Sequence, residues 1–135
     1  MANALFDFYR SQCLTADVDL DDSIVLVFVD HGIDTPVPAT DDFLDDILAG
    51  ARIATSGAFT SKTFTAGVFD AADVTVATVS GASFESIVIY DNTPATEATK
   101  DLIAFIDTAT GLPTTPNGGD ITVQWNNDAN RIFKL

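Results

Sequence analysis

The hydrophobic pattern of the chain changes its period along the sequence. Residues 24–29, IVLVFV, form an unbroken β-branched and aromatic run bounded by aspartates. A run without alternation is typical of a strand covered on both faces, so this segment is predicted to be the central strand of a sheet. Upstream of it, Leu5, Phe8 and Tyr9 recur at helical spacing. They predict a short helix at about 4–13 whose apolar face packs on a sheet or on a neighbouring subunit.

A second helix is predicted from the segment TDDFLDDILAG. Thr40 can cap its start, the aspartates that follow suit the positive end of a helix dipole, and Gly50 can end it. Aspartates 45 and 46 fall on the side opposite to the apolar residues, which share one face and are Phe43, Leu44, Ile47 and Leu48. These features predict a helix of about ten residues at 41–49, docked by one face.

Downstream of Arg52 the pattern alternates with a period of two. The strand-like segments that follow are DVTVATVSG, SFESIVIYD, DLIAFIDT and DITVQWN. Turn residues such as Gly81 separate them, which favours antiparallel hairpins. A parallel order would need a helix between most strands, and none is predicted there. The sequence therefore predicts a mainly β, single-domain protein over 1–135, an antiparallel β-sandwich or barrel-like sheet of about six to eight strands with two short helices.

The apolar segment RIFKL closes the chain after the turn-forming sequence NNDAN. A turn between two extended segments favours a hairpin, so residues 132–135 are predicted to pair with 120–126. Docking onto another protein is the secondary interpretation of this end. Trp125 shares one strand face with Ile121 and Val123, which favours a core or subunit-interface residue over an exposed sugar platform.

Two further segments fit no regular period. Phe59, Phe64 and Phe69 recur in a Thr-rich stretch, which is predicted to be irregular edge structure available to a partner. The loop at 108–120 is rich in proline and glycine and is long for a hairpin link. It is therefore predicted to be a rigid excursion or a contact loop.

The net charge of the chain limits the kinds of partner that it can bind. Its 135 residues carry 20 acidic and 6 basic side chains, a formal net charge of −14, and the basic ones are scattered singly. Neutralising phosphates needs clustered Lys and Arg, so direct nucleic-acid binding and an anionic membrane surface are disfavoured. No run approaches the ~20 apolar residues of a membrane span, and the start of the chain lacks a signal-peptide pattern. We expect synthesis in a cytoplasm and a soluble protein.

The segment DVDLDD invites a calcium interpretation. Asp17, Asp19 and Asp21 have the spacing of the first ligands of an EF-hand loop. The loop also needs glycine at its sixth position and glutamate at its twelfth, where this chain has Asp22 and Phe28. The EF-hand therefore fails, and a solvated acidic turn is favoured over a loosely bound cation, which stays open.

Other catalytic constellations are weaker still. The carboxylates of TDDFLDD are expected on an exposed helix side, where nothing would tune their pKa values for acid–base work. His31 is the only histidine, and no serine lies in a G-x-S-x-G elbow. Cys13 is the only cysteine, so no intrachain disulfide is expected. We expect no enzyme, no cofactor and no metal.

Several segments together resemble a family of small structural proteins encoded by tailed bacteriophages. The resemblance covers nearly the whole chain and is most specific from FIDTATGLPTTPNGGDI to ANRIFKL, and in DDFLDDI followed by ARIAT. It implies a virion component, first of all a capsid decoration (cement) protein. Such a protein would bind the outer surface of the major capsid protein shell and stabilise it, and would contact neighbouring copies of itself as a homo-oligomer. It would be made in the host bacterial cytoplasm and end on the capsid exterior.

If the decoration role holds, two segments are expected to make the contacts. They are the N-terminal segment 1–15 and the loop 108–119, and the residues expected to touch partners are Leu5, Phe8, Tyr9, Leu112, Pro113 and Pro116. Two alternatives stay open. A phage neck, tail or fibre-base component would share the same composition. A β-sandwich module for a host glycan would instead show solvent-facing aromatics near the 108–120 loop.

Overall fold

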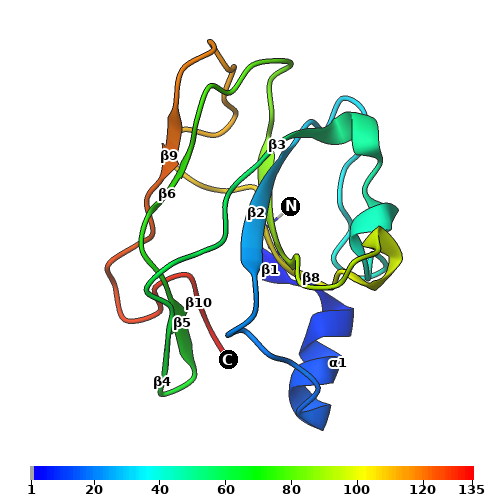
Figure 1. Ribbon diagram of the computed structural model, residues 1–135, viewed down its shortest axis with the longest axis vertical. Coiled ribbons are helices and arrows are strands. Elements are labelled where there is room, and N and C mark those ends of the chain that lie inside the picture. Colours follow the sequence, from blue (N-terminus) through cyan, green and yellow to red (C-terminus); the bar gives the residue numbers. More distant parts are fainter. Residues whose placement is uncertain (1) are drawn as a thin grey trace.

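The computed structural model describes residues 2–135 and confirms a mainly β chain with antiparallel pairing throughout (Figure 1). Its ten strands form three sheets, and the described residues contain one α-helix. The strands exceed the predicted number because several are only two or three residues long. The arrangement is sandwich-like, with a large sheet in the middle, short strands on one face and helical turns on the other (Figure 1).

The large sheet has five strands in the order β1-β8-β7-β2-β3. Their bounds are β1 Ala4–Leu5, β8 Leu102–Ile106, β7 Ser86–Asp91, β2 Ile24–Val29 and β3 Arg52–Thr55. Every residue of β2 is buried, which confirms the strand that the IVLVFV run predicts, covered on both faces. The middle position belongs to β7, however, because the N-terminal β1 adds a strand beyond β8.

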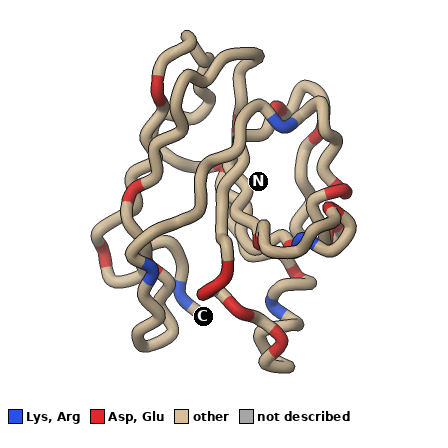
Figure 2. The backbone as a smooth tube through the Cα atoms, in the orientation of Figure 1, with Lys and Arg blue, Asp and Glu red and all other residues tan. Residues whose placement is uncertain are grey.

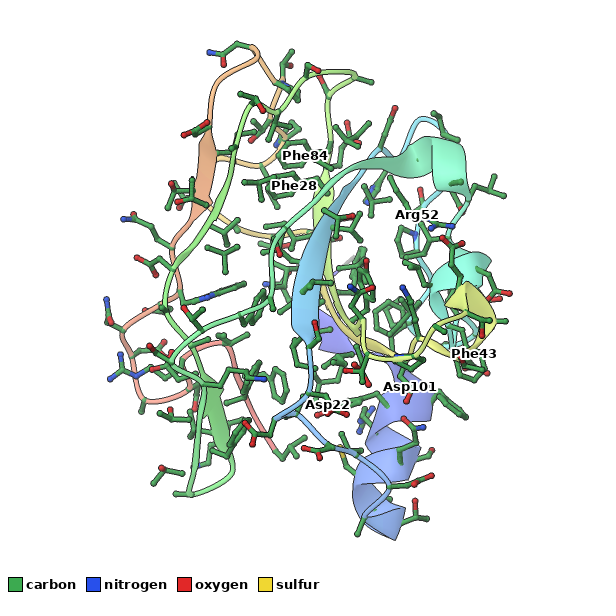
Figure 3. The ribbon with its side chains drawn as sticks, viewed as in Figure 1. Asp22, Phe28, Phe43, Arg52, Phe84 and Asp101 are labelled. Carbon is green, nitrogen blue, oxygen red and sulfur yellow. The ribbon has the colours of Figure 1, made fainter. Side chains whose placement is uncertain are left out.

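Five short strands form the outer layer. They are β4 Thr63–Thr65, β5 Val68–Asp70 and β10 Phe133–Lys134 in one sheet, and β6 Val74–Val76 and β9 Ile121–Val123 in another. Aromatic rings fill the space between this layer and the large sheet. The rings of Phe28 and Phe84 stack with centroids 4.2 Å apart (Figure 3). Trp125 is buried against Phe59, which confirms it as a core residue.

The Thr-rich segment is more regular than predicted. Residues Thr63–Asp70 form the β4-β5 hairpin, and Phe59 and Phe69 are buried in the core. Among the three phenylalanines of this segment, Phe64 alone stays exposed. The expectation of an irregular, partner-facing edge was wrong for the other two, because their side chains are buried.

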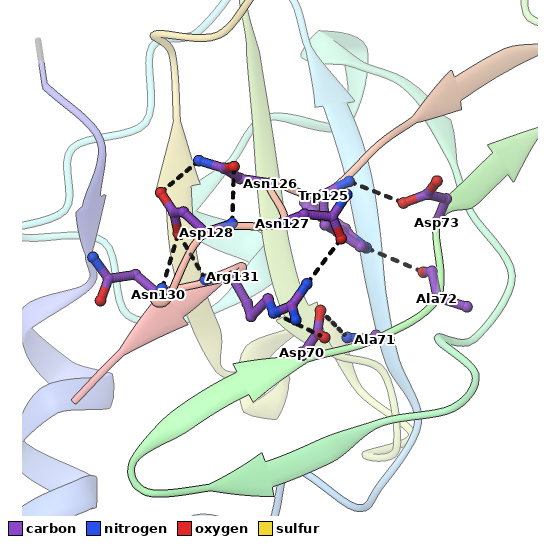
Figure 4. A network of polar contacts seen from close by, with 10 residues as sticks. All are labelled: Asp70, Ala71, Ala72, Asp73, Trp125, Asn126, Asn127, Asp128, Asn130 and Arg131. Carbon is purple, nitrogen blue, oxygen red and sulfur yellow. Dashed lines mark hydrogen bonds and ion pairs between the residues drawn. The ribbon is translucent and has the colours of Figure 1, made fainter.

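The C-terminal segment does not pair with 120–126, so the predicted hairpin was wrong. Strand β9 pairs with β6, and β10 crosses to pair with β5. The turn between them is held by side chains (Figure 4). Asp128 accepts backbone N–H bonds from Asn130 and Arg131, and the Arg131 guanidinium lies 3.6 Å from the Asp70 carboxylate of β5. These contacts redirect the chain toward β5 instead of back along β9.

The predicted helix at 41–49 is also wrong. Two short 3₁₀ turns, η1 Leu44–Asp46 and η2 Ala49–Ala51, stand in its place. The Asp46 carboxylate accepts the backbone N–H groups of Asp42 and Phe43, at 2.8 and 3.0 Å. Phe43 is extended and bridges to residue 101. Aspartate side chains that bond nearby backbone compete with helical bonds, and here they win.

The N-terminal helix exists but begins later than predicted. Helix α1 spans Asp7–Thr15, whereas Leu5 belongs to β1, which pairs with β8. A third 3₁₀ turn, η3 Glu97–Thr99, lies beside η1. The Arg52 guanidinium binds the Glu97 carboxylate at 2.8 and 2.9 Å and joins this turn to β3.

Candidate docking surface

His31 is the first residue to consider for chemistry. Its Nε2 lies 2.8 Å from the Ser86 hydroxyl, and its backbone N–H donates to the Glu85 carboxylate. Ser86 is 0 % exposed, and the His31 ring stacks beside the buried Phe105. A nucleophile must reach its substrate, and this hydroxyl is closed off within β7. The His31–Ser86 hydrogen bond therefore has a structural role at the end of β2.

The acidic segment at 17–22 forms a turn. The Asp19 carboxylate accepts the backbone N–H of Asp21 at 2.9 Å, and the Lys62 ammonium donates to the carbonyl oxygen of Asp22. Partial desolvation, followed by repulsion from Asp19 and Asp91, raises the pKa of Asp22. Within residues 2–135 no group of three or more His, Cys, Asp or Glu side chains is placed to hold a metal ion.

Exposed apolar side chains gather around α1. The described residues include six large apolar side chains that are well exposed, and four of them line two grooves beside this helix: Leu14, Val37, Phe64 and Leu135. Leu14 is 89 % exposed and Leu135 is 61 % exposed. A cluster of this kind is typical of an interaction surface, whereas single exposed apolar residues are not. We call these four residues the apolar patch.

The wide groove has a volume of about 1180 Å³ and runs along one side of α1. Leu5, Leu14, Val37 and Leu135 are among its lining residues. The start of the helix is fixed there because the backbone N–H of Asp7 donates to the carbonyl oxygen of Pro38 at 2.8 Å. The turn at 37–39 therefore forms one wall of this groove.

The narrow groove lies between the end of α1, the acidic turn and the β4 strand, and has a volume of about 330 Å³. Val18, Leu20 and Phe64 supply apolar walls, and Asp19 and Asp21 also line it. The two grooves share two lining residues, Cys13 and Leu135. The backbone N–H of Leu135 donates to the carbonyl oxygen of Gly67, which holds the chain end in place.

The predicted N-terminal contact residues separate on α1 and β1. Leu5 lines the wide groove, and Tyr9 lines the narrow one. Phe8 instead packs edge-on against Phe43 with ring centroids 5.0 Å apart. Phe8 lines neither groove, because its ring is taken up by this contact. Partner contact itself stays a prediction for all of them.

The predicted contact loop lies at the other end of the molecule from α1 (Figure 1). Pro113 is exposed, while Leu112 and Pro116 are half-buried. The loop is held rigidly because Phe84 and Thr114 exchange two backbone hydrogen bonds, at 2.9 and 3.0 Å. Leu112 lines a cavity of about 650 Å³ between the layers. The aromatic residues of that cavity, Phe28, Phe84 and Trp125, are buried, so they form no exposed sugar platform.

The narrow groove was missed by sequence reasoning. One signal was present, because Val18 and Leu20 alternate with aspartates in ADVDLDD. In the structure this segment is a turn instead of a strand, and its apolar and acidic residues line the groove together. The remaining walls come from β4 and from the chain end, and no local pattern connects these segments.

The Asp101 carboxylate, which contacts Gln12 of α1, lies in an unfavourable environment. The side chain of Gln12 donates through Nε2 to Asp101 at 3.0 Å, while its own Oε1 is buried without a hydrogen-bond partner. Burial raises the pKa of Asp101, repulsion from Asp91 and other aspartates adds to this, and the Gln12 bond opposes it. The folded state therefore holds a proton on Asp101 more tightly than the unfolded state does.

We expect Asp101→Asn to stabilise the protein at pH 7 by about 0.5–1 kcal/mol, the usual worth of one net hydrogen bond. The new amide keeps an acceptor for Gln12, adds a donor and removes a repelled charge. In the wild type the charged Asp101 destabilises the folded state at pH values above its raised pKa. This destabilisation disappears as the pH falls toward the ordinary pKa of 3.8, because the carboxyl becomes protonated. Urea unfolding between pH 7 and 4 should show the difference shrinking. An Asp101→Asn protein less stable than wild type at pH 7 would contradict this.

No family model matches the chain, and no match is found among the curated proteins. No helix within residues 2–135 has the length and apolar character to cross a membrane. The resemblance to phage virion proteins therefore stays a prediction, and the proposals that follow are supported by the residues and their arrangement.

Proposed function

We propose that this protein is a non-enzymatic structural component of a phage particle, a decoration protein that binds the outer surface of the major capsid protein shell. The observation that carries the proposal is the apolar patch around α1, where Leu14, Val37, Phe64 and Leu135 are exposed together. Burying such side chains releases about 1.5–3 kcal/mol each when the burial is complete. The patch is therefore suited to contact with another protein.

The position of the second predicted contact segment supports a bridging role. Helix α1, beside which the apolar patch lies, and the 108–120 loop are at opposite ends of the molecule (Figure 1). A protein that contacts two neighbours through opposite ends can link subunits of a shell. Many modest contacts repeated by shell symmetry then give firm attachment through avidity, even when each one is weak.

The charge supports an outer position. Acidic positions are spread along the tube, and lysines and arginines are few among them (Figure 2). With a net charge of −14, the protein would be repelled by packaged DNA, so the outside of the shell is the favoured place.

Copy number separates the decoration role from a neck or tail role. We would add the purified protein to particles that lack it and determine the bound positions by cryo-electron microscopy. Roughly hundreds of copies at symmetric shell positions would support decoration, and about a dozen or fewer at one vertex would support a neck or tail component. No bound copies on any part of the particle would overturn both.

Leu14→Ser tests the patch itself. Leu14 is 89 % exposed, so its replacement should leave the fold intact while weakening attachment to particles by about tenfold or more. Leu48→Ser is the matched control, because Leu48 is 57 % exposed and does not line either groove. Binding is measured by co-sedimentation of labelled protein with particles. Equal attachment of the two variants would remove the patch from the contact.

A further inference from the structure

The narrow groove combines apolar walls with negative charge that is not neutralised by a cation of the described chain. Val18 and Leu20 are half-buried, Phe64 is 48 % exposed, and Asp19 and Asp21 are exposed beside them. Neither carboxylate forms an ion pair with another part of the described chain, residues 2–135. The acidic turn at 17–22 connects α1 to β2 and ends at Asp22, which is labelled in Figure 3. Figure 2 shows acidic positions along this connection. The surface at this groove thus favours a positively charged occupant.

A buried polar group also lines this groove. Tyr9 is 1 % exposed, and its hydroxyl has no hydrogen-bond partner of normal geometry. The Cys13 thiol lies beside it, and burial raises the pKa of Tyr9 far above its usual value, so the phenol stays neutral. An unsatisfied buried hydroxyl costs about 1–3 kcal/mol. A ligand that reaches this hydroxyl and offers an N–H donor would recover part of this cost.

We propose that the narrow groove binds an arginine side chain presented by a partner protein, with Asp19 and Asp21 holding the guanidinium and Phe64 packing on its face. The proposal rests on the proposed function in one respect, since it takes the partner to be the shell protein. Arginine fits because its flat guanidinium is weakly hydrated, stacks on aromatic rings and donates several hydrogen bonds in one plane. Its aliphatic stem suits the walls made by Val18 and Leu20.

A metal ion fits this groove less well. Divalent cations such as Ca²⁺ take six or more oxygen ligands. Two carboxylates beside apolar walls leave most of that shell unfilled, and the described residues hold no cluster of three potential ligands. Charge complementarity together with the apolar walls therefore favours an amphipathic cation.

The first test uses a capped peptide, GVRVG, and its counterpart with citrulline, the neutral isostere of arginine. Titration into ¹⁵N-labelled protein should shift the backbone amides of residues 16–21 and 63–65, with a dissociation constant on the order of 1 mM for so short a ligand. The citrulline peptide should bind about tenfold more weakly, and added salt should weaken the arginine peptide alone. Equal binding of the two peptides would overturn the proposal.

The second test replaces the carboxylates. Asp19→Asn with Asp21→Asn should weaken the arginine peptide about tenfold, because asparagine keeps the turn-forming acceptor but removes the charge. The double variant Asp42→Asn with Asp45→Asn is the matched control: it removes two charges from positions outside the groove. If both double variants bind the peptide equally, the groove is not the site.

Particle binding separates this proposal from the proposed function. If the wild type and the Asp19→Asn, Asp21→Asn variant attach to particles equally well, the arginine contact is overturned and the decoration role stands. Specific binding of the arginine peptide without any attachment to particles would support the groove chemistry and overturn the shell as partner. Loss of attachment by this variant alone, with the Asp42→Asn, Asp45→Asn control unaffected, would support both.

Discussion

Phe28→Ala is expected to lower the free energy of unfolding by about 3–5 kcal/mol, the range for truncating a fully buried phenylalanine. Phe28 is completely buried in β2, and its ring stacks on that of Phe84 at 4.2 Å with an angle of 9°. The outer layer consists of strands of two or three residues and cannot close over a cavity of this size by itself. The loss would thus remove a large part of the stability that a domain of this size has.

Urea unfolding followed by circular dichroism measures this loss. Phe64→Ala is the matched control, because Phe64 in β4 is 48 % exposed and its ring contacts that of Phe69, so a smaller loss of about 1–2 kcal/mol is expected from it. Similar losses in the two variants would mean that the layers are not held together by the Phe28–Phe84 stack.

The parts of the fold that were predictable are those specified by local pattern. The run at 24–29 has no polar residue, and a strand buried on both faces is the only extended structure that suits it. The alternation in SFESIVIYD and the run LIAFI likewise indicated β7 and β8. Antiparallel pairing followed because no helix separates most of these strands.

The parts that were not predictable depend on competition between partners. The segment 41–49 has good helical spacing, yet the Asp46 carboxylate bonds the backbone at residues 42 and 43 and keeps it extended there. The C-terminal strand could pair with 120–126 or with any free edge. It pairs with β5, where Phe133 packs on Phe69, and the Asp128 turn and the Arg131–Asp70 contact support this pairing.

The candidate site shows the same division. Helical spacing correctly predicted an apolar side of the N-terminal segment. It could not predict that Phe8 packs against Phe43 instead of lining a groove. The narrow groove needs the end of α1, the acidic turn, β4 and the last residue together. Surfaces assembled from segments so far apart in sequence are outside the reach of periodicity, which reports only on neighbours along the chain.

Phe133→Ala is expected to lower the free energy of unfolding by about 2–3 kcal/mol, less than a fully buried site because Phe133 is only half-buried. Its ring lies between two parts of the molecule, with centroids 6.2 Å from Tyr9 of α1 and 5.3 Å from Phe69 of β5. It therefore links the outer layer to the N-terminal helix.

Hydrogen exchange distinguishes this role from a general loss of stability. If Phe133 joins the two parts, its removal should speed exchange in α1 and in β5 more than in β7, which pairs on both sides within the large sheet. Leu135→Ala is the control, since Leu135 is 61 % exposed and its removal should cost less than about 1 kcal/mol. Uniform acceleration across α1, β5 and β7 would mean that the protein opens as one unit. In that case the grooves beside α1 would be as rigid as the core, and the chain end would serve the docking surface only by lining it.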